Sequence, residues 1–264
     1  METKSSSMIS HLNTSDNMKL EQYLLEIEGF IKNYLENTHM DGYVLGLSGG
    51  VDSSLVAALT KRAVGKDKLM CIMMPIDSDP SDLNDAKKVA EALDLKYLVI
   101  DGSKSFHETV KRFEEEGMSL DRMTLSNLKV RIRMTILYAY GQTHKSLVLG
   151  TDNWCERYTG YFTKYGDGAA DLLPIVYLNK GEVVEAAKLL GVPASLAERV
   201  PSAGLFDGQT DEKEMGVLYK DLDDYLLGKE VEEKTKERIE YLHRVSEHKR
   251  SPIPTPKEFI RDEK

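Results

Sequence analysis

The chain has 264 residues, of which 41% are hydrophobic and 30% charged, and its formal net charge is −9. This length suits one large α/β domain with a sizeable core, and no apolar run approaches the roughly 20 residues that span a bilayer. The acidic balance argues against a general nucleic-acid groove, because such grooves need clustered Lys and Arg. We therefore expect neither a membrane nor a nucleic acid as partner, although a small anionic ligand needs only a local basic pocket.

The N-terminal stretch is polar and rich in Ser and Asn, and it lacks the hydrophobic segment of a secretory signal. We expect residues 1–18 to form a flexible tail and residues 19–264 to form a single domain, since no linker separates two units. Residues 20–35 show the apolar spacing of one helix face. The apolar positions are Leu20, Leu24, Ile27, Ile31 and Tyr34.

Short apolar runs and amphipathic stretches then alternate along the chain. The predicted strands are 43–47, 68–76, 96–101 and 146–151, and the predicted helices are 53–65, 81–94, 104–113 and 126–142. The strands are continuously apolar, which is typical of a parallel sheet covered on both faces. We therefore expect an α/β fold, a doubly wound, Rossmann-like three-layer sandwich with a parallel β-sheet. Ligands of such folds bind at the carboxyl ends of the strands, here near Ser48, Asp77 and Thr151.

The alternation of apolar runs and amphipathic stretches ends near residue 158. Residues 158–174 are rich in Gly and aromatic residues without any period, which favours a functional surface loop. A helix over 179–193, a second irregular stretch over 200–216 and acidic helical pieces follow. The two cysteines are too few for a disulfide framework or a metal knuckle, so we expect a cytoplasmic protein. Cys71 lies in an apolar run and is expected to be a small buried hydrophobe.

The stretch GLSGGVDSS, residues 46–54, joins a predicted strand to a predicted helix. Its glycines let backbone N–H groups converge on an anion near the positive end of the helix dipole. The pattern is neither GxxxxGK[ST] nor GxGxxG. An aspartate beside a polyphosphate requires a bridging cation, and Mg²⁺ favours one or two carboxylates with phosphate oxygens and water. Asp52 is therefore either a helix N-terminal acid or a magnesium ligand.

SGGVDSS resembles the signature loop of the ATP pyrophosphatases, adenylating enzymes that split ATP between its α and β phosphates. Further segments resemble the ammonia-dependent NAD synthetases within that group, in the family's order and over roughly residues 19–255. These segments are NLKVRIRM, LVLGTDNWCERYTGYFTKYGDGAADLLP, VPSAGL, DEKEMG and EHKR.

The resemblance implies an ATP site and a metal site. Glu156 matches the family's second magnesium ligand, beside Asp52; without the resemblance it reads as an exposed acid on a short helix. The implied ATP-binding residues are Gly46, Leu47, Ser48, Gly49, Gly50, Val51, Asp52, Ser53, Thr151, Lys180 and Ser202. Alone, Lys180 reads as an ordinary helix-start lysine and Ser202 as a loop serine.

The second substrate implied by the resemblance is deamido-NAD. The implied contacts are Arg131, Lys164, Asp171, His248 and Lys249. His248 alone reads as a solvated tail residue. Arg131 and Arg133 point to different faces of one helix, and Arg133 is expected to pair with an acid. Cys155 is expected to have no catalytic function, because the ammonia-dependent reaction needs no thiol.

The implied reaction is an acid–ammonia ligation that needs ATP and Mg²⁺ and completes NAD biosynthesis. The nicotinate carboxylate attacks the α-phosphorus, pyrophosphate leaves, and ammonia then displaces AMP. We expect free ammonia as donor, because the amidase domain of glutamine-hydrolysing relatives has no counterpart in the sequence. Asp167 is the candidate that attracts ammonium and takes its proton, with Asp171 second; both read equally as loop-capping acids.

The resemblance also implies a homodimer, with which the apolar helix over 121–141 is compatible; the same helix is equally compatible with a core position. Two rivals are another ATP pyrophosphatase and a nucleotide-binding regulatory module. A tRNA-thiolating enzyme predicts paired cysteines and a basic face, which the chain lacks. A regulatory module predicts the loss of a metal carboxylate or cation, yet these residue types are present at Asp52, Glu156, Lys164 and Lys180.

Overall fold

A four-stranded parallel sheet forms the centre of the fold in the computed structural model, which describes residues 14–199 and 210–259. The strands are β1 (Gly42–Gly46), β2 (Leu69–Met73), β3 (Tyr97–Val99) and β4 (Ser146–Leu149), in the spatial order β3-β2-β1-β4. All three pairings are parallel. The order of the strands switches between β1 and β4, so the loops that leave these two strands meet at the position where such sheets bind ligands.

Helices cover both faces of β1, β2 and β4, as the apolar strands predict, whereas the edge strand β3 is exposed. The long helices of the sheet region are α1 (Thr14–Glu36), α2 (Val51–Val64), α3 (Pro80–Ala92), α4 (Ser103–Glu115), α5 (Arg122–Thr143) and α7 (Lys180–Leu189). On one face, α1, α2, α3 and α7 pack on Leu45, Cys71 and Leu149. On the other face, α5 packs on Val44, Ile72 and Val148. The predicted doubly wound three-layer α/β fold is confirmed.

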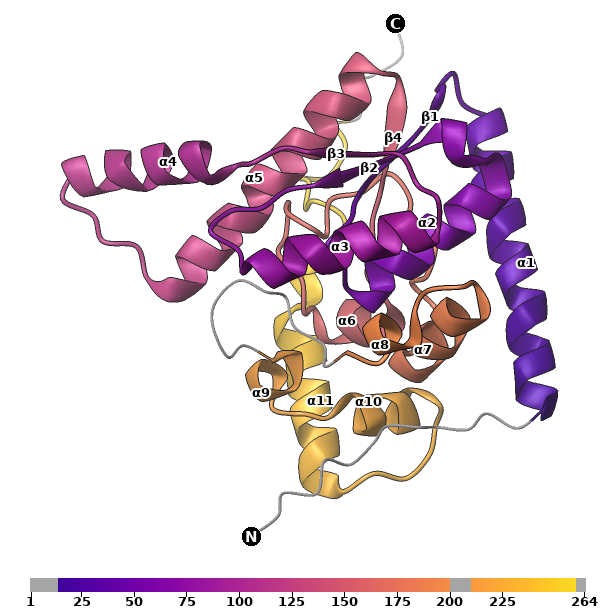
Figure 1. Ribbon diagram of the computed structural model, residues 1–264. Helices are drawn as coiled ribbons and strands as arrows, with labels where there is room; N and C mark the ends of the chain where they lie inside the picture. The colour runs from indigo at the N-terminus through magenta and orange to yellow at the C-terminus, as the bar shows by residue number, and fades with distance from the viewer. Residues whose placement is uncertain (1–13, 200–209, 260–264) are drawn as a thin grey trace, which may run out of the picture.

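The chain ends in a small helical cluster beside the sheet region. It contains α9 (Asp211–Met215), α10 (Tyr219–Leu226) and α11 (Glu233–Val245) and packs against α6 (Trp154–Thr159). Figure 1 shows α9, α10 and α11 at the lower end of the molecule, below the sheet. A separate apolar core holds the cluster together, with Cys155, Met215, Tyr219 and Ile239 among its buried members. The short helices α8 (Ala194–Ala197), η1 (Lys66–Lys68) and η2 (Glu247–Lys249) complete the described elements.

Two boundaries differ from the sequence expectation. Helix α1 begins at Thr14, so residues 14–18, expected to be part of the tail, are helical. Helix α6 extends to Thr159, the second residue of the stretch 158–174 that was expected to be a loop, and it begins with a reciprocal capping box between Asn153 and Glu156. In such a box each of two residues satisfies a backbone N–H of the other, which stabilises even a short helix.

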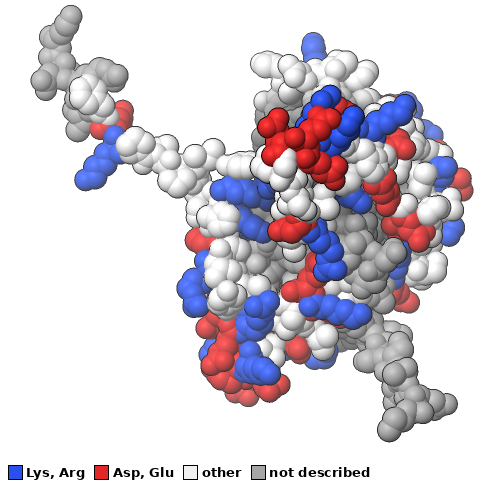
Figure 2. Space-filling model, turned by 90° about the vertical axis from the view of Figure 1, so that its left-hand side faces the viewer, with Lys and Arg blue, Asp and Glu red and all other residues white. Residues whose placement is uncertain are grey.

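The distribution of charged side chains on the surface agrees with the acidic composition of the chain. Figure 2 shows Lys and Arg interspersed with Asp and Glu, without a continuous basic surface among the described residues on the face in view. Within residues 14–199 and 210–259, no helix combines the length and the apolarity needed to cross a bilayer. Cys71 and Cys155 are both free and buried, so the expectation for Cys71 is confirmed.

Candidate functional site

A cavity of about 590 Å³ lies at the carboxyl ends of β1 and β4. Most of the glycine-rich loop lines it, together with residues from the loops after β4 and from α6 and α7. The predicted site residues that line it are Gly46, Leu47, Ser48, Gly50, Val51, Asp52, Ser53, Thr151, Glu156, Asp167, Lys180 and Lys249. The sheet topology thus brings together residues that are far apart in the sequence.

The glycine loop takes its shape from backbone conformation and from its own hydroxyl groups. Gly49 has φ of +84°, and a Cβ atom there would lie 2.7 Å from the backbone nitrogen of Ala86 on α3. The Ser48 and Ser53 hydroxyls are 3.1 Å apart, and the N–H of Gly50 donates to Ser48 Oγ over 3.2 Å. Gly50 is the N-cap of α2 and has no side-chain cap. The first turn of α2 is therefore open to an anionic ligand.

Lys180 joins the two predicted metal carboxylates at the floor of the cavity. Its Nζ lies 2.6 Å from Asp52 Oδ2 and 3.4 Å from Glu156 Oε1. The side chain is only 5% exposed, and burial alone would lower the pKa of Lys180. The two carboxylates outweigh burial and raise its pKa instead, so the ammonium group stays charged. We call Asp52, Glu156 and Lys180 the floor cluster.

Polar neighbours hold each carboxylate of the floor cluster in place. Asn153 Nδ2 donates to Asp52 Oδ1 over 2.8 Å, and the Tyr219 hydroxyl lies 3.3 Å from Glu156 Oε1. Burial, aided by the negative charge of Asp52 and opposed by Lys180, raises the pKa of Glu156 to about 8. A divalent cation next to Glu156 would reverse this shift, because it favours the ionised form.

Helix α10 fixes the lysine end of the floor cluster. The carboxylate of Asp223 accepts the backbone N–H of Lys180 over 3.0 Å and that of Gly181 over 2.8 Å. It also accepts the thiol of Cys155 at 3.0 Å. Burial and the adjacent Asp223 raise the pKa of Cys155 well above its ordinary value, so this thiol is a poor nucleophile. The expectation that Cys155 has no nucleophilic role agrees with this environment.

Asp167 and Lys249 also line the cavity. Asp167 Oδ1 accepts the N–H groups of Thr163, over 2.6 Å, and Gly168. Its carboxyl group is deeply surrounded by protein but faces the open cavity; burial raises its pKa, and the two hydrogen bonds and Lys249 oppose the rise. Lys249 Nζ donates to the carbonyls of Gly160 and Phe162, both over 2.7 Å.

Three other predicted substrate residues lie together, but they do not line the cavity. Arg131 donates to the Lys164 carbonyl over 3.3 Å, and Lys164 Nζ donates to the His248 carbonyl over 2.6 Å. We call Arg131, Lys164 and His248 the rim. Asp171 lies apart from both groups, where its Oδ2 accepts the Val148 N–H over 2.7 Å; it lines a shallow depression with Tyr138 and Gln142.

The comparisons with known proteins agree with this geometry. A profile described as NAD synthase matches residues 23–253. The chain belongs to the NAD synthase family. The NH(3)-dependent NAD(+) synthetase of Mesoplasma florum is 41% identical over 92% of this chain and 100% of its own length. The enzyme of the same name from Pyrococcus furiosus is 43% identical over 88% of this chain and 93% of its own. The family resemblance found in the sequence is confirmed.

Two solved structures extend the similarity to the fold. An NMN synthetase from Francisella tularensis is 38% identical with a TM-score of 0.85, over 90% of this chain and 98% of that one. An NH3-dependent NAD synthetase from Campylobacter jejuni is 29% identical with a TM-score of 0.75, over 90% of this chain and 99% of that one. The names of these two similar structures thus refer to two different products.

The floor cluster fits the metal expected in the NAD synthase family. Within the residues that the structure describes, no three His, Cys, Asp or Glu side chains form a metal site on their own. Mg²⁺ does not need one, since it usually takes one or two carboxylates and completes its shell with phosphate oxygens and water. Asp52 Oδ2 and Glu156 Oε1 both approach the Lys180 nitrogen, so the two carboxylates lie near each other. Because the ammonium group occupies the point between them, a metal ion would bind beside it.

Some residues of the site were not predicted from the sequence, and others lie in surroundings that differ from the prediction. Arg133 lines the cavity and donates to the Met74 carbonyl over 3.0 Å and to Ser78 Oγ over 3.3 Å; no acid within residues 14–199 and 210–259 forms the ion pair expected for it. Asn153 and Tyr219 hold the floor carboxylates; only Asn153 had a readable signal, the N-x-x-E capping box. Ser202 lies outside the described residues.

Proposed function

We propose that the chain is an ammonia-dependent NAD synthetase, which amidates deamido-NAD and converts ATP to AMP and pyrophosphate. The observation that carries this proposal is the floor cluster beside the glycine loop. It places two carboxylates and a buried ammonium group at the strand ends, next to an uncapped helix N-terminus. Phosphoryl groups are stabilised by this combination of cations and backbone N–H groups.

Each part of the site has one task in the adenylation step. Residues 46–53 hold the pyrophosphate that leaves, and Thr151 contacts the nucleotide at the end of β4. Asp52 and Glu156 would hold Mg²⁺, which neutralises the phosphate charge when bound. Lys180, held by both carboxylates, adds a fixed positive charge. No side chain forms a covalent bond, so catalysis rests on positioning and charge.

Asp167, Lys249 and the rim bind the acid substrate and ammonia. Arg131, Lys164, His248 and Lys249 supply groups for the anionic parts of deamido-NAD, and Asp171 supplies a hydrogen-bond acceptor. Asp167 attracts ammonium and accepts a proton from it. Its raised pKa supports this assignment, because a base must bind the proton more tightly than an ordinary carboxylate does near neutral pH.

The homodimer also belongs to the proposal. Helix α5 packs one side on the sheet, and apolar side chains on the neighbouring elements remain exposed. These are Leu98, Val99, Phe113 and Met118, and Met123 is exposed on α5 itself. Gel filtration with light scattering tests the proposal, and a monomer at assay concentration would contradict it. A cytoplasmic location stays a prediction.

A second candidate product is NMN, because a relative that is 38% identical with a TM-score of 0.85 is an NMN synthetase. That reaction would use the same loop and floor cluster but a mononucleotide acid in place of a dinucleotide. The two candidates differ only in what occupies the outer part of the site.

The deciding experiment incubates the protein with MgATP, ammonium and either deamido-NAD or nicotinate mononucleotide. We expect NAD, AMP and pyrophosphate in equal amounts, with the higher kcat/KM on deamido-NAD. A higher kcat/KM on the mononucleotide would favour NMN synthesis. NAD without AMP would contradict the adenylation route, and adenylation of other acids alone would favour another ATP pyrophosphatase.

A further inference from the structure

Asp152 is a buried carboxylate without a hydrogen-bond partner in the described part of the chain. The residue is 3% exposed, and no donor reaches its Oδ2 atom. The guanidinium group of Arg157 is nearby, but Nη1 lies 3.7 Å from Oδ2, beyond hydrogen-bond distance. Buried carboxylates are normally hydrogen-bonded, and an unsatisfied one is costly. The Oδ2 atom of Asp152 can therefore accept a hydrogen bond from a ligand in the cavity.

The position of Asp152 in the cavity indicates the chemical class of the donor that it would bind. The residue lines the same cavity as Asp167 and Glu156. Burial, strengthened by these two neighbouring carboxylates and only partly offset by Arg157, raises the pKa of Asp152 well above its ordinary value. A small cation in the cavity would stabilise the ionised form and supply hydrogen bonds at the same time.

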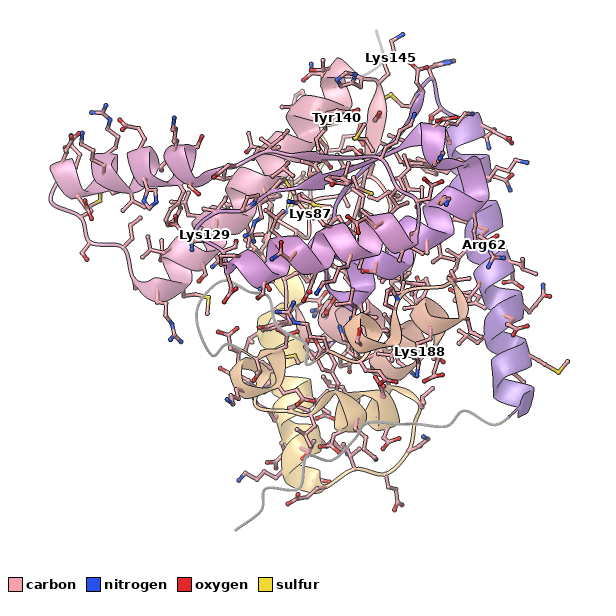
Figure 3. All side chains as sticks on the ribbon, in the orientation of Figure 1. Arg62, Lys87, Lys129, Tyr140, Lys145 and Lys188 are labelled. Carbon is pink, nitrogen blue, oxygen red and sulfur yellow. The ribbon has the colours of Figure 1, made fainter. Side chains whose placement is uncertain are left out.

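Glu28 provides a contrast within the same chain. Its Oε1 atom is also buried without an accepted hydrogen bond, but Arg62 Nε lies 3.0 Å away across the contact between α1 and α2. Figure 3 labels Arg62 at this position, on the side of α2 that faces α1. Glu28 does not line the cavity described above. A fixed cation thus compensates Glu28, whereas Asp152 faces the place where substrates bind.

We infer that Asp152 and Asp167 together form the ammonium-binding subsite of the cavity. Ammonium carries one positive charge and N–H donors in four directions, so it can reach two carboxylates and still point toward a third group. Asp167 already accepts two backbone N–H groups, and Asp152 brings acceptor capacity that the described protein groups leave unused. The inference rests on the proposed function, since it assigns a place to the nitrogen donor.

The kinetic test uses Asp152→Asn, which keeps the shape of the side chain and removes its charge. We expect the KM for ammonium to rise by about 10- to 100-fold, as for a lost charged hydrogen bond. The exchange of pyrophosphate into ATP, which depends on deamido-NAD but not on ammonium, should stay within about twofold of the unchanged protein. Glu28→Gln is the matched control and should change neither quantity.

A binding measurement keeps the inference testable without catalysis. Ammonium chloride should raise the melting temperature more than sodium chloride at equal concentration, because a ligand that binds only the folded state stabilises it. This difference should disappear in Asp152→Asn and persist in Glu28→Gln. If the protein makes neither NAD nor NMN, the proposed function fails, and this measurement alone decides the ammonium subsite.

Two results would overturn the inference. One is a lower kcat in Asp152→Asn with an unchanged KM for ammonium, which would indicate a structural role. The other is an equal ammonium-specific shift in the melting temperature with and without the carboxylate. If Asp152→Asn does not fold, Asp152→Glu replaces it: the charge remains but moves by about one methylene, and an unchanged KM for ammonium would again contradict the subsite.

Discussion

The floor cluster and the rim are built in opposite ways. In the floor cluster, the carboxyl groups of Asp52 and Glu156 contact the Lys180 ammonium group directly. The lysine side chain is only 5% exposed, and the two acids are partly buried. In the rim, Arg131 and Lys164 donate to backbone carbonyls, and no carboxylate within residues 14–199 and 210–259 forms an ion pair with either. The contacts among the three side chains of the floor cluster are thus already formed before a ligand binds. The rim keeps its positive charge available for a negatively charged substrate.

The largest expected effect comes from breaking the floor cluster. Asp52→Asn removes the ion pair to Lys180 and one of the two proposed metal carboxylates. We expect kcat/KM for adenylation to fall by about 10²- to 10³-fold, as for the loss of one electrostatic stabiliser of a transition state. ATP–pyrophosphate exchange with deamido-NAD measures the loss, and far-UV circular dichroism checks the fold.

Asp67→Asn is the control for this variant, because Asp67 forms an exposed ion pair with Lys96 outside the cavity. It should keep the exchange rate, since exposed pairs contribute little. If Asp52→Asn also kept the original exchange rate, the assignment of Asp52 as a metal ligand would be wrong. The contacts within the floor cluster would then not be needed for adenylation.

The second prediction concerns the backbone that presents the floor. Gly49→Ala places a Cβ 2.7 Å from the backbone of α3 at a φ of +84°. We expect about 1–3 kcal/mol of lost stability, from the strained conformation and the close contact together. Gly117→Ala isolates the cost of the strained backbone conformation, because Gly117 has φ of +76° but nothing within 4 Å of the added Cβ atom. Equal urea midpoints for the two variants would show that the contact with α3 is unimportant.

The sequence predicts single residues of the site better than it predicts the contacts between them. Asp52 could be placed because a glycine loop between a strand and a helix has few possible shapes. The pairing of Asp52 with Lys180 could not, because 128 positions separate them and only the sheet topology brings them together. For the same reason the unpartnered state of Asp152 appears only in three dimensions. The position of Asp171 at a separate depression could not be read from the sequence either, and its predicted contact with deamido-NAD stays a prediction.

The third prediction tests whether the rim acts through charge. Lys164→Met removes the ammonium group that donates to the His248 carbonyl but keeps a long apolar side chain. We expect the KM for deamido-NAD to rise by about three- to tenfold, with an unchanged KM for ATP, as for one partly exposed charged contact. An equal rise for both substrates would show that the rim and the floor are not separate.

The smallest expected effect is a pH dependence of stability that belongs to the floor alone. A glutamate in an unfolded chain has a pKa of about 4.3, whereas Glu156 has a pKa of about 8 in the folded protein without metal. Between these values the folded state holds a proton that the unfolded state has released. The unfolded state therefore binds fewer protons, and the free energy of unfolding falls as pH rises through this window.

Glu156→Gln removes that titration and isolates its contribution. From pH 7 to pH 8, in the presence of a chelator, the unchanged protein should lose about 1 kcal/mol of stability relative to the variant. Urea unfolding at each pH measures the difference, which should level off above pH 8 once Glu156 is ionised in both states. A difference that stays constant with pH would mean that Lys180 already holds Glu156 ionised. The floor would then need no metal to keep both carboxylates charged, and Lys180 rather than Mg²⁺ would be the cation around which it is built.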